Sequence, residues 1–244
     1  MANNIVQDAL NHLTEDLRTT HGSNLSAVIL YGSAAAGDHA ASYGDYNVLV
    51  ALKRITPEDL RLAQAPTREW QRMGHPVPVY FTADELRSAA DVFPIEFHQM
   101  ERSRVVLYGE DPFESMQISD LNLRHQTEYE LRSKLIQLRR RYIPSSVSIE
   151  KLTALMSDSL ESFATLFAPV LLLHGQQPPV NKQDCVAATV RLLRLDGEPF
   201  GKIFSLRSKA APHLSEAEAH ELFTFYMEQI ERVIDAVDNL PIGS

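Results

Sequence analysis

The sequence has a single cysteine, Cys185, among its 244 residues. One thiol cannot form an intrachain disulfide, a multi-cysteine zinc site or an iron–sulfur cluster, and such a chain is typical of a reducing compartment. Long hydrophobic runs are scarce as well: the strongly apolar stretch at 167–173 is far shorter than the roughly 20 residues that a membrane-spanning helix needs. The polar first residues do not resemble a signal peptide. We therefore expect a cytoplasmic protein without a membrane segment.

Basic residues are also in short supply, because 23 Lys and Arg stand against 32 Asp and Glu, which gives a net charge of −9. A negative field of this kind repels polyanions, so we do not expect nucleic acid as a partner. The excess acid is concentrated in residues 1–114, with 9 basic and 16 acidic residues (net −7), whereas residues 115–244 have 14 and 16 (net −2). This change places a domain boundary near residues 114–120. The overall composition, 44% hydrophobic and 23% charged, is that of a folded globular chain.

The first part of the chain alternates between helical and strand periods. Apolar residues three and four apart predict an opening helix that ends near Gly22, and a capping threonine, Thr56, predicts a helix that runs to about Met73. A third helix should begin at the capping box that Thr82 opens. Short apolar runs predict strands at 27–31, 46–52, 77–81, 93–100 and 104–108. Residues 1–116 should therefore form an α/β domain on a mixed sheet.

The second part of the chain has the period of helices almost throughout. Amphipathic segments predict four helices, at 121–142, 149–173, 181–193 and 215–239. Helices of this length with short polar links are typical of a bundle. We therefore predict an α+β chain in which residues 117–244 form an α-helical bundle domain.

The segment that carries chemistry lies between the first two predicted strands. Gly32 and Ser33 follow the first strand, and after a gap of eleven residues Asp45 and Asn47 lead into the second. Residues two apart on a strand point to the same face, so the side chains at 45 and 47 should converge on one point. A carboxylate there can bind a divalent cation that bridges the phosphates of a nucleoside triphosphate, and Gly-Ser can receive a phosphate. The alternative is an ordinary turn between two strands, with Asp45 as a turn residue.

This pattern resembles that of the polymerase-β-like nucleotidyltransferase superfamily, whose signature is a strand, Gly-Ser, a similar gap and an Asp-x-Asp/Glu pair on the next strand. The helical second domain is similar to that of the kanamycin and related aminoglycoside nucleotidyltransferases, in which it helps to form the acceptor pocket. The resemblance implies Mg²⁺-dependent transfer of a nucleotidyl group from a nucleoside triphosphate to a hydroxyl acceptor. It also implies that Asp45 and Asn47 hold the metal and that Gly32, Ser33 and Asn47 contact the nucleotide.

Asn47 stands where the signature has its second acid. An amide keeps a carbonyl oxygen but lacks the negative charge, and Mg²⁺ favours carboxylate and phosphate oxygens, so the affinity for the metal should fall. Two hypotheses follow. The chain is either a nucleotidyltransferase for a small or cationic acceptor, or a catalytically inactive nucleotide-binding or protein-interaction module of the same fold. The acceptor, the preferred nucleotide and the oligomeric state are left open.

A third acid is expected on a neighbouring strand, where it would act as general base on the acceptor hydroxyl. The predicted strand 93–100 offers Glu96, which alternates with the apolar Ile95 and Phe97. Glu96 is therefore our candidate catalytic residue beside Asp45. The alternative interpretation is the solvated face of an amphipathic strand.

Three further patterns are less specific. Arg207 and His213 have the spacing of the Arg and His of HEPN ribonucleases, a resemblance that would imply RNA cleavage. Cys185 has no basic neighbour and is expected to be a packed side chain rather than a nucleophile. Basic residues that could hold a triphosphate or a polyanionic acceptor gather on the predicted helix 121–142: Arg124, Arg132, Lys134, Arg139, Arg140 and Arg141. The alternative for residues 139–141 is that they complement the negative end of that helix.

Overall fold

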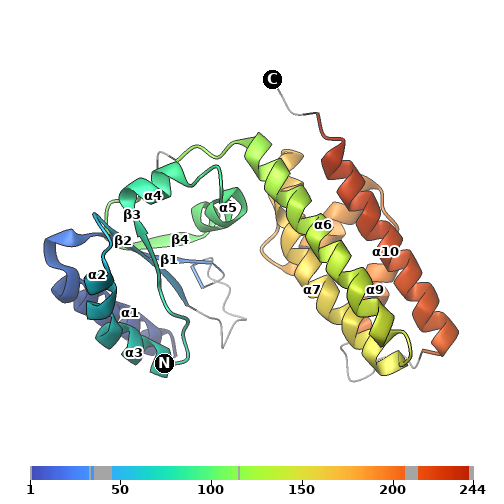
Figure 1. The fold of residues 1–244 in the computed structure, drawn as a ribbon, viewed down its shortest axis with the longest axis horizontal. Helices are drawn as coiled ribbons and strands as arrows, with labels where there is room; N and C mark the ends of the chain where they lie inside the picture. The colour runs from blue at the N-terminus through green and yellow to red at the C-terminus, as the bar shows by residue number, and fades with distance from the viewer. Residues whose placement is uncertain (1, 33, 36–45, 115, 207–213, 242–244) are drawn as a thin grey trace. The chain divides into compact units, whose positions relative to one another are not determined.

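The computed structural model divides the chain into two compact units, residues 1–119 and 120–244, each of which is described by itself (Figure 1). The structure describes residues 2–32, 34–35, 46–114, 116–206 and 214–241, with side chains from residue 7 onward. The predicted site residues Ser33 and Asp45 lie outside the described residues, as do Arg207 and His213.

Within the described residues, unit 1 is built on a four-stranded sheet with the strand order β3-β2-β1-β4. β1 (Leu25–Tyr31) lies antiparallel to both β2 (Asn47–Leu52) and β4 (Arg104–Gly109), whereas β2 and β3 (Val79–Thr82) are parallel. A parallel pair needs a crossover connection, which here is helical. The predicted mixed sheet is confirmed.

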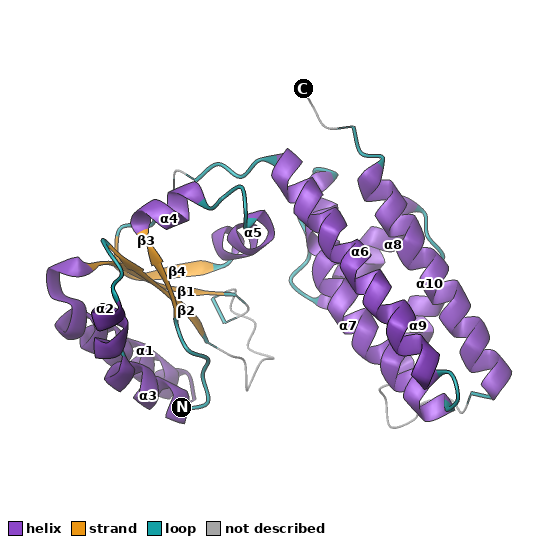
Figure 2. Ribbon diagram, in the orientation of Figure 1, coloured by secondary structure: helices purple, strands orange, loops and turns teal. Residues whose placement is uncertain are grey.

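Helices cover both faces of this sheet (Figures 1 and 2). Val48 and Val50 of β2 belong to the core on the face of α1 and α3, where Trp70 is 1% exposed. The alternate residues of the strands, such as Leu49, belong to the core on the face of α4 and α5, with Phe97. Both cores are thus fixed by the alternation of apolar side chains along the strands. The helices are α1 (Ala2–His21), α2 (Pro57–Leu62), α3 (Gln64–Arg72), α4 (Ala83–Ser88) and α5 (Pro94–Arg102).

Two predictions for unit 1 need correction. The helix expected from 57 to about 73 is divided at Ala63 into α2 and α3, although the capping box at Thr56 is confirmed. The strand expected at 93–100 is wrong, because these residues form most of α5. Pro94 occupies the first turn of that helix, where its missing N–H costs nothing. Residues 94, 97 and 100 are buried at a spacing of three, the helical period that the apparent alternation concealed.

Unit 2 is helical, as predicted, and its described residues form one helix more than expected (Figure 2). The additional helix, α9 (Glu198–Ser205), has Pro199 in its first turn and buries Phe200 and Ile203. The others are α6 (Asp120–Ser145), α7 (Ile149–Leu173), α8 (Lys182–Leu193) and α10 (Glu216–Asp238).

α7 is the central helix of unit 2. Its length and composition alone would allow it to cross a membrane, but 67% of its most apolar window is buried inside the structure. Phe163 and Phe167 of this helix are 1% and 0% exposed. Phe163 meets the ring of Tyr226 edge-on, and Phe167 meets the ring of Phe200 in the same way. These contacts are those of a core helix in a bundle.

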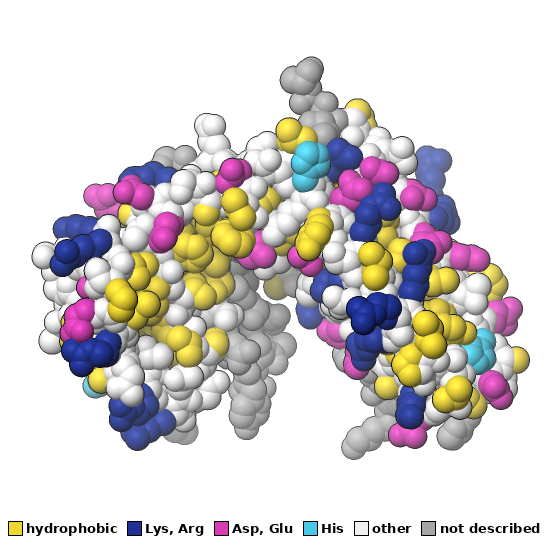
Figure 3. Space-filling model, in the orientation of Figure 1, with side chains coloured by type: hydrophobic (Ala, Val, Ile, Leu, Met, Phe, Trp, Pro, Cys, Tyr) yellow, Lys and Arg dark blue, Asp and Glu magenta, His cyan; other side chains and the backbone are white. Residues whose placement is uncertain are grey.

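Three arginines of α6 make contacts with α10 within unit 2. Arg124 donates from Nε to the Val237 carbonyl and from Nη2 to the Asp238 carbonyl, both at 3.0 Å, so it caps the last turn of α10. Arg132 pairs with the carboxylate of Asp238 at 3.0 Å, and Arg139 pairs with Glu231, which also lies on α10. Figure 3 shows basic side chains over this unit interspersed with acidic and hydrophobic ones. These three arginines thus join α6 to α10.

Cys185 lies in the core of unit 2, where it is 4% exposed. Its Sγ donates to the carbonyl oxygen of Pro179 at 3.1 Å. The prediction of a packed side chain is confirmed.

Candidate functional site

The candidate site begins where β1 ends, at Gly32. This glycine has φ +85°, a left-handed conformation that favours residues without a side chain. Its N–H donates to the carbonyl of Ser103 at 2.9 Å, and its own carbonyl accepts from the N–H of Ala35 at 3.0 Å. The chain therefore makes a tight, hydrogen-bonded turn directly after the strand, as the Gly-Ser pattern predicts.

Asn47 lies beside this turn, at the first position of β2. It is the register partner of Tyr31, the residue that precedes Gly32. A Cβ built on Gly32 would lie 3.4 Å from Nδ2 of Asn47. Residues 32 and 47 are fifteen apart in the sequence, and the hairpin pairing of the two strands brings them together. The two halves of the motif thus meet at one end of the sheet.

A row of three residues crosses the sheet at this end. Tyr31 pairs with Asn47 on one side and with Arg104, the first residue of β4, on the other. Directly opposed residues of antiparallel strands project from the same face, and here it is the face that α4 and α5 cover. Burial raises the pKa of the Tyr31 hydroxyl, so this side chain stays neutral at ordinary pH.

Sequence reasoning did not select Tyr31 or Arg104. A signal for Arg104 was available, because it is the one charged side chain at the head of an otherwise apolar strand. Its pairing with Tyr31 depends on the antiparallel contact of β1 and β4, two segments that are far apart in the sequence. No local sequence pattern predicts that contact.

Glu96 was predicted on a strand, and this placement is wrong. It lies in the first turn of α5, where it is exposed. Glu96 therefore does not lie on a strand face opposite Ile95 and Phe97, as the alternation of these residues had suggested. Its role as general base stays a prediction without that geometric support.

The described residues meet only part of the coordination needs of a Mg²⁺ ion. Within the described part of the chain, no cluster of three or more His, Cys, Asp or Glu side chains could hold a metal ion. The described site contributes a neutral amide, Asn47, which offers a carbonyl oxygen of the hard type that Mg²⁺ accepts. A Mg²⁺ ion here would therefore depend on Asp45 and on the oxygens of a bound phosphate.

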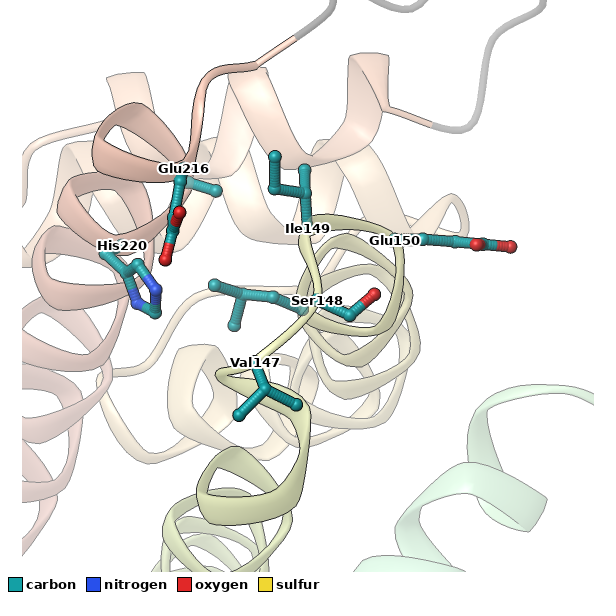
Figure 4. A pocket seen from close by; sticks show the side chains of 8 residues that line it. Val147, Ser148, Ile149, Glu150, Glu216 and His220 are labelled. Atoms are coloured by element: carbon teal, nitrogen blue, oxygen red, sulfur yellow. The ribbon is translucent and has the colours of Figure 1, made fainter.

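Unit 2 contains a cavity of about 340 Å³ beside the first turns of α7 and α10. Glu216 and His220 extend toward it from one face of α10, whereas Glu150 points away (Figure 4). The His220 ring is hydrogen-bonded through Nδ1 to the Tyr142 hydroxyl at 2.8 Å. The described residues that line this cavity all belong to unit 2.

Over nearly its full length the fold of the chain is similar to that of a solved adenyltransferase. The solved structure that shows this is spectinomycin adenyltransferase AAD(9) from Enterococcus faecialis with ATP and spectinomycin. The match has a TM-score of 0.55 at 13% sequence identity, and it covers 96% of this chain and 99% of that chain. No protein-family model matches the sequence, and no curated protein matches it. Identity this low shows the shared fold alone.

Proposed function

We propose that the protein transfers a nucleotidyl group from a nucleoside triphosphate, with ATP as the first candidate, to a hydroxyl of a small acceptor. The observation that carries this proposal is the meeting of the Gly32 turn with Asn47 at one end of the sheet. The fold adds support, because the solved structure that shares it was determined with ATP and spectinomycin.

The chain's own residues have separable roles in this proposal. Gly32 leaves the backbone open to the triphosphate, since it has no side chain. Ser33 supplies a hydroxyl to a phosphate oxygen, and Asp45 supplies the negative charge that holds Mg²⁺, with Asn47 as a neutral second ligand. The metal, when bound, offsets the charge of the phosphates.

A small or cationic acceptor suits this protein better than a polyanion. Residues 1–114, which contain the whole motif, carry a net charge of −7 from 9 basic and 16 acidic residues. Such a field attracts cationic molecules and repels polyanions. Spectinomycin is the first acceptor to test, because the solved structure with a similar fold was determined with it.

The direct experiment is pyrophosphate release from ATP with spectinomycin as acceptor, in the presence and absence of Mg²⁺. We expect release that requires the metal and is abolished in Asp45→Ala. Asp91→Ala, which removes an exposed acid elsewhere in unit 1, is the matched control and should retain activity. Turnover that survives intact in Asp45→Ala would rule out this mechanism.

The second hypothesis, an inactive nucleotide-binding module, is favoured by Asn47. Under it the wild type binds ATP but releases no pyrophosphate with any acceptor. Asn47→Asp restores the missing charge and should then create turnover. Glu96→Gln, assayed in an active form, tests the general base: a loss of turnover at unchanged ATP affinity supports that role, and full activity removes it.

A further inference from the structure

Arg104 and Asp111 form a mostly buried ion pair beside the candidate site. Nε and Nη2 of Arg104 each lie 2.7 Å from Oδ2 of Asp111, and the two side chains are 19% and 22% exposed. The third nitrogen, Nη1, donates to the carbonyl oxygen of Glu101. The guanidinium carbon lies 5.6 Å from the ring centroid of Phe113. All three nitrogens of Arg104 therefore contact the protein.

Asp111 is itself held in place. Its Oδ1 accepts from the N–H of Phe113 at 2.9 Å. Phe113 is 1% exposed and meets the ring of Phe97 on α5 edge-on, with 5.9 Å between the centroids. The pair thus ties the chain that follows β4 to the C-terminal end of α5.

The same junction holds the Gly32 turn. α5 ends at Arg102, and Ser103 connects it to β4. The carbonyl of Ser103 accepts the N–H of Gly32 at 2.9 Å. Because Glu101 is only two residues before Ser103, the bond from Arg104 to the Glu101 carbonyl restrains the backbone from which the Ser103 carbonyl projects.

The energetics favour a geometric role for this pair. Desolvation offsets most of the attraction in a buried ion pair, so its net contribution to stability is small. A guanidinium fork fixed on a carboxylate and on a carbonyl nevertheless defines the positions of all three groups. Arg104 shares its row with Asn47, and its guanidinium is directed to Asp111 and to the carbonyl of Glu101.

We propose that Arg104 and Asp111 are positioning residues that set the Gly32 turn for the triphosphate. They act through the carbonyls of Glu101 and Ser103. The identity of the ligand rests on the proposed function, whereas the control of the Gly32 backbone by the ion pair is a property of the unliganded protein.

The first test is amide hydrogen exchange, measured by NMR on the unliganded full chain. In Asp111→Asn and in Arg104→Gln the Gly32 amide should exchange faster by about tenfold or more, because its acceptor is no longer held. Arg61→Gln is the matched control, since the pair of Arg61 with Glu58 is exposed on α2 and should leave Gly32 unchanged.

The amides of Leu49 and Val50 in the central strand β2 are the internal reference. Acceleration at Gly32 that exceeds the change at these two amides supports the proposal. Exchange at Gly32 that is unchanged, or that rises only as much as the reference amides, overturns it, because the latter reports a general loss of stability.

The second test is the affinity for ATP with Mg²⁺. Asp111→Asn and Arg104→Gln should weaken binding by the same factor, about tenfold, and the double variant should be no weaker than either, because the two residues act as one unit. A loss in Arg104→Gln without a loss in Asp111→Asn would mean that Arg104 binds the phosphate directly and would overturn the proposal. If the wild type binds no ATP, the proposed function fails, and the exchange result still decides whether the pair controls the turn.

Discussion

Gly32 holds its turn in a conformation that an alanine adopts only under strain. Its φ of +85° should cost Gly32→Ala about 1–2 kcal/mol of the free energy of unfolding. Gly74→Ala is a matched control, because Gly74 has φ +91° in the turn after α3 and a Cβ there meets nothing within 4 Å. Urea denaturation should show a similar loss in both variants. Titration with ATP should show a loss of affinity in Gly32→Ala alone.

The contrast between these two glycines is the informative result. Equal affinities for ATP in the two variants would separate the Gly32 turn from nucleotide binding. A loss of stability in Gly74→Ala but none in Gly32→Ala would contradict the strained conformation itself.

His21 should make the stability of unit 1 depend on pH. It is 7% exposed, neither ring nitrogen has a hydrogen-bond partner within the described residues, and it meets the Tyr80 ring edge-on at 5.9 Å. Burial lowers the pKa of His21 below its ordinary value of 6.5, and the charge of Asp59 opposes this effect in part. The unfolded chain therefore takes up the proton first as the pH falls. Stability is fully present above pH 6.5 and is lost below it, by at most about 1.4 kcal/mol per pH unit.

His21→Leu should remove this loss. Urea midpoints measured between about pH 7.5 and pH 5 should fall less in the variant than in the wild type. His12→Gln, on the exposed face of α1, should leave the pH dependence as it is. Parallel pH profiles for wild type and His21→Leu would contradict a buried, neutral His21.

Local patterns predicted the motif residues, and the contacts among distant segments could not be predicted. The apolar runs on either side of the motif predicted both strands and the turn at Gly32, and the family resemblance implied that Gly32 and Asn47 share a site. Arg104 reaches the site only because β4 pairs with β1, and its partnership with Asp111 depends on how the chain turns after β4. Such pairings depend on tertiary structure.

Two helices show why short elements are the difficult ones. α5 was mistaken for a strand because Ile95 and Phe97 are two apart, although the buried set also includes Pro94 and Met100. α9 is eight residues long and includes Pro199 and Gly201, which are poor helix formers in general. Both helices bury residues that are three apart in the sequence. In so short a segment, this helical period of apolar residues is hard to distinguish from the two-residue period of a strand.

The start of α10 is a capping box that should stabilise unit 2. Oγ of Ser215 accepts from the N–H of Glu218 at 3.3 Å, and the Glu218 carboxylate accepts from the N–H of Ser215 at 2.8 Å. Ser215→Ala removes the acceptor and should cost about 1 kcal/mol. Ser215→Asp keeps an acceptor and should cost less. Urea denaturation followed by far-ultraviolet circular dichroism checks both, and identical midpoints for wild type and Ser215→Ala would contradict the cap.

Each unit has a hydrophobic core of its own. Within the described residues, the core of unit 1 lies on the two faces of its sheet, and that of unit 2 surrounds α7. Both units are of a size that folds independently in many proteins. The fragment 120–244 alone should therefore be helical by circular dichroism and should unfold cooperatively in urea. A fragment with little helix or without a cooperative transition would contradict the statement that unit 2 folds on its own core.

The likeness to the adenyltransferase structure extends across both units, since it covers 96% of this chain. At 13% identity the fold has been kept while most side chains differ. Under the proposed function, activity depends on the few residues at one end of the sheet in unit 1. We propose that their charge balance, with Asn47 in place of an acid, determines whether a bound triphosphate also reacts.

We propose that a triphosphate binds with Mg²⁺ where β1 ends and β2 begins. Isothermal titration of the full chain with a non-hydrolysable ATP analogue tests it without any need for turnover or for a known acceptor. We predict binding that requires Mg²⁺ and that weakens by about tenfold or more in Asp45→Ala but not in Asp91→Ala. Equal affinities in all three proteins, or no binding to the wild type, would contradict the claim.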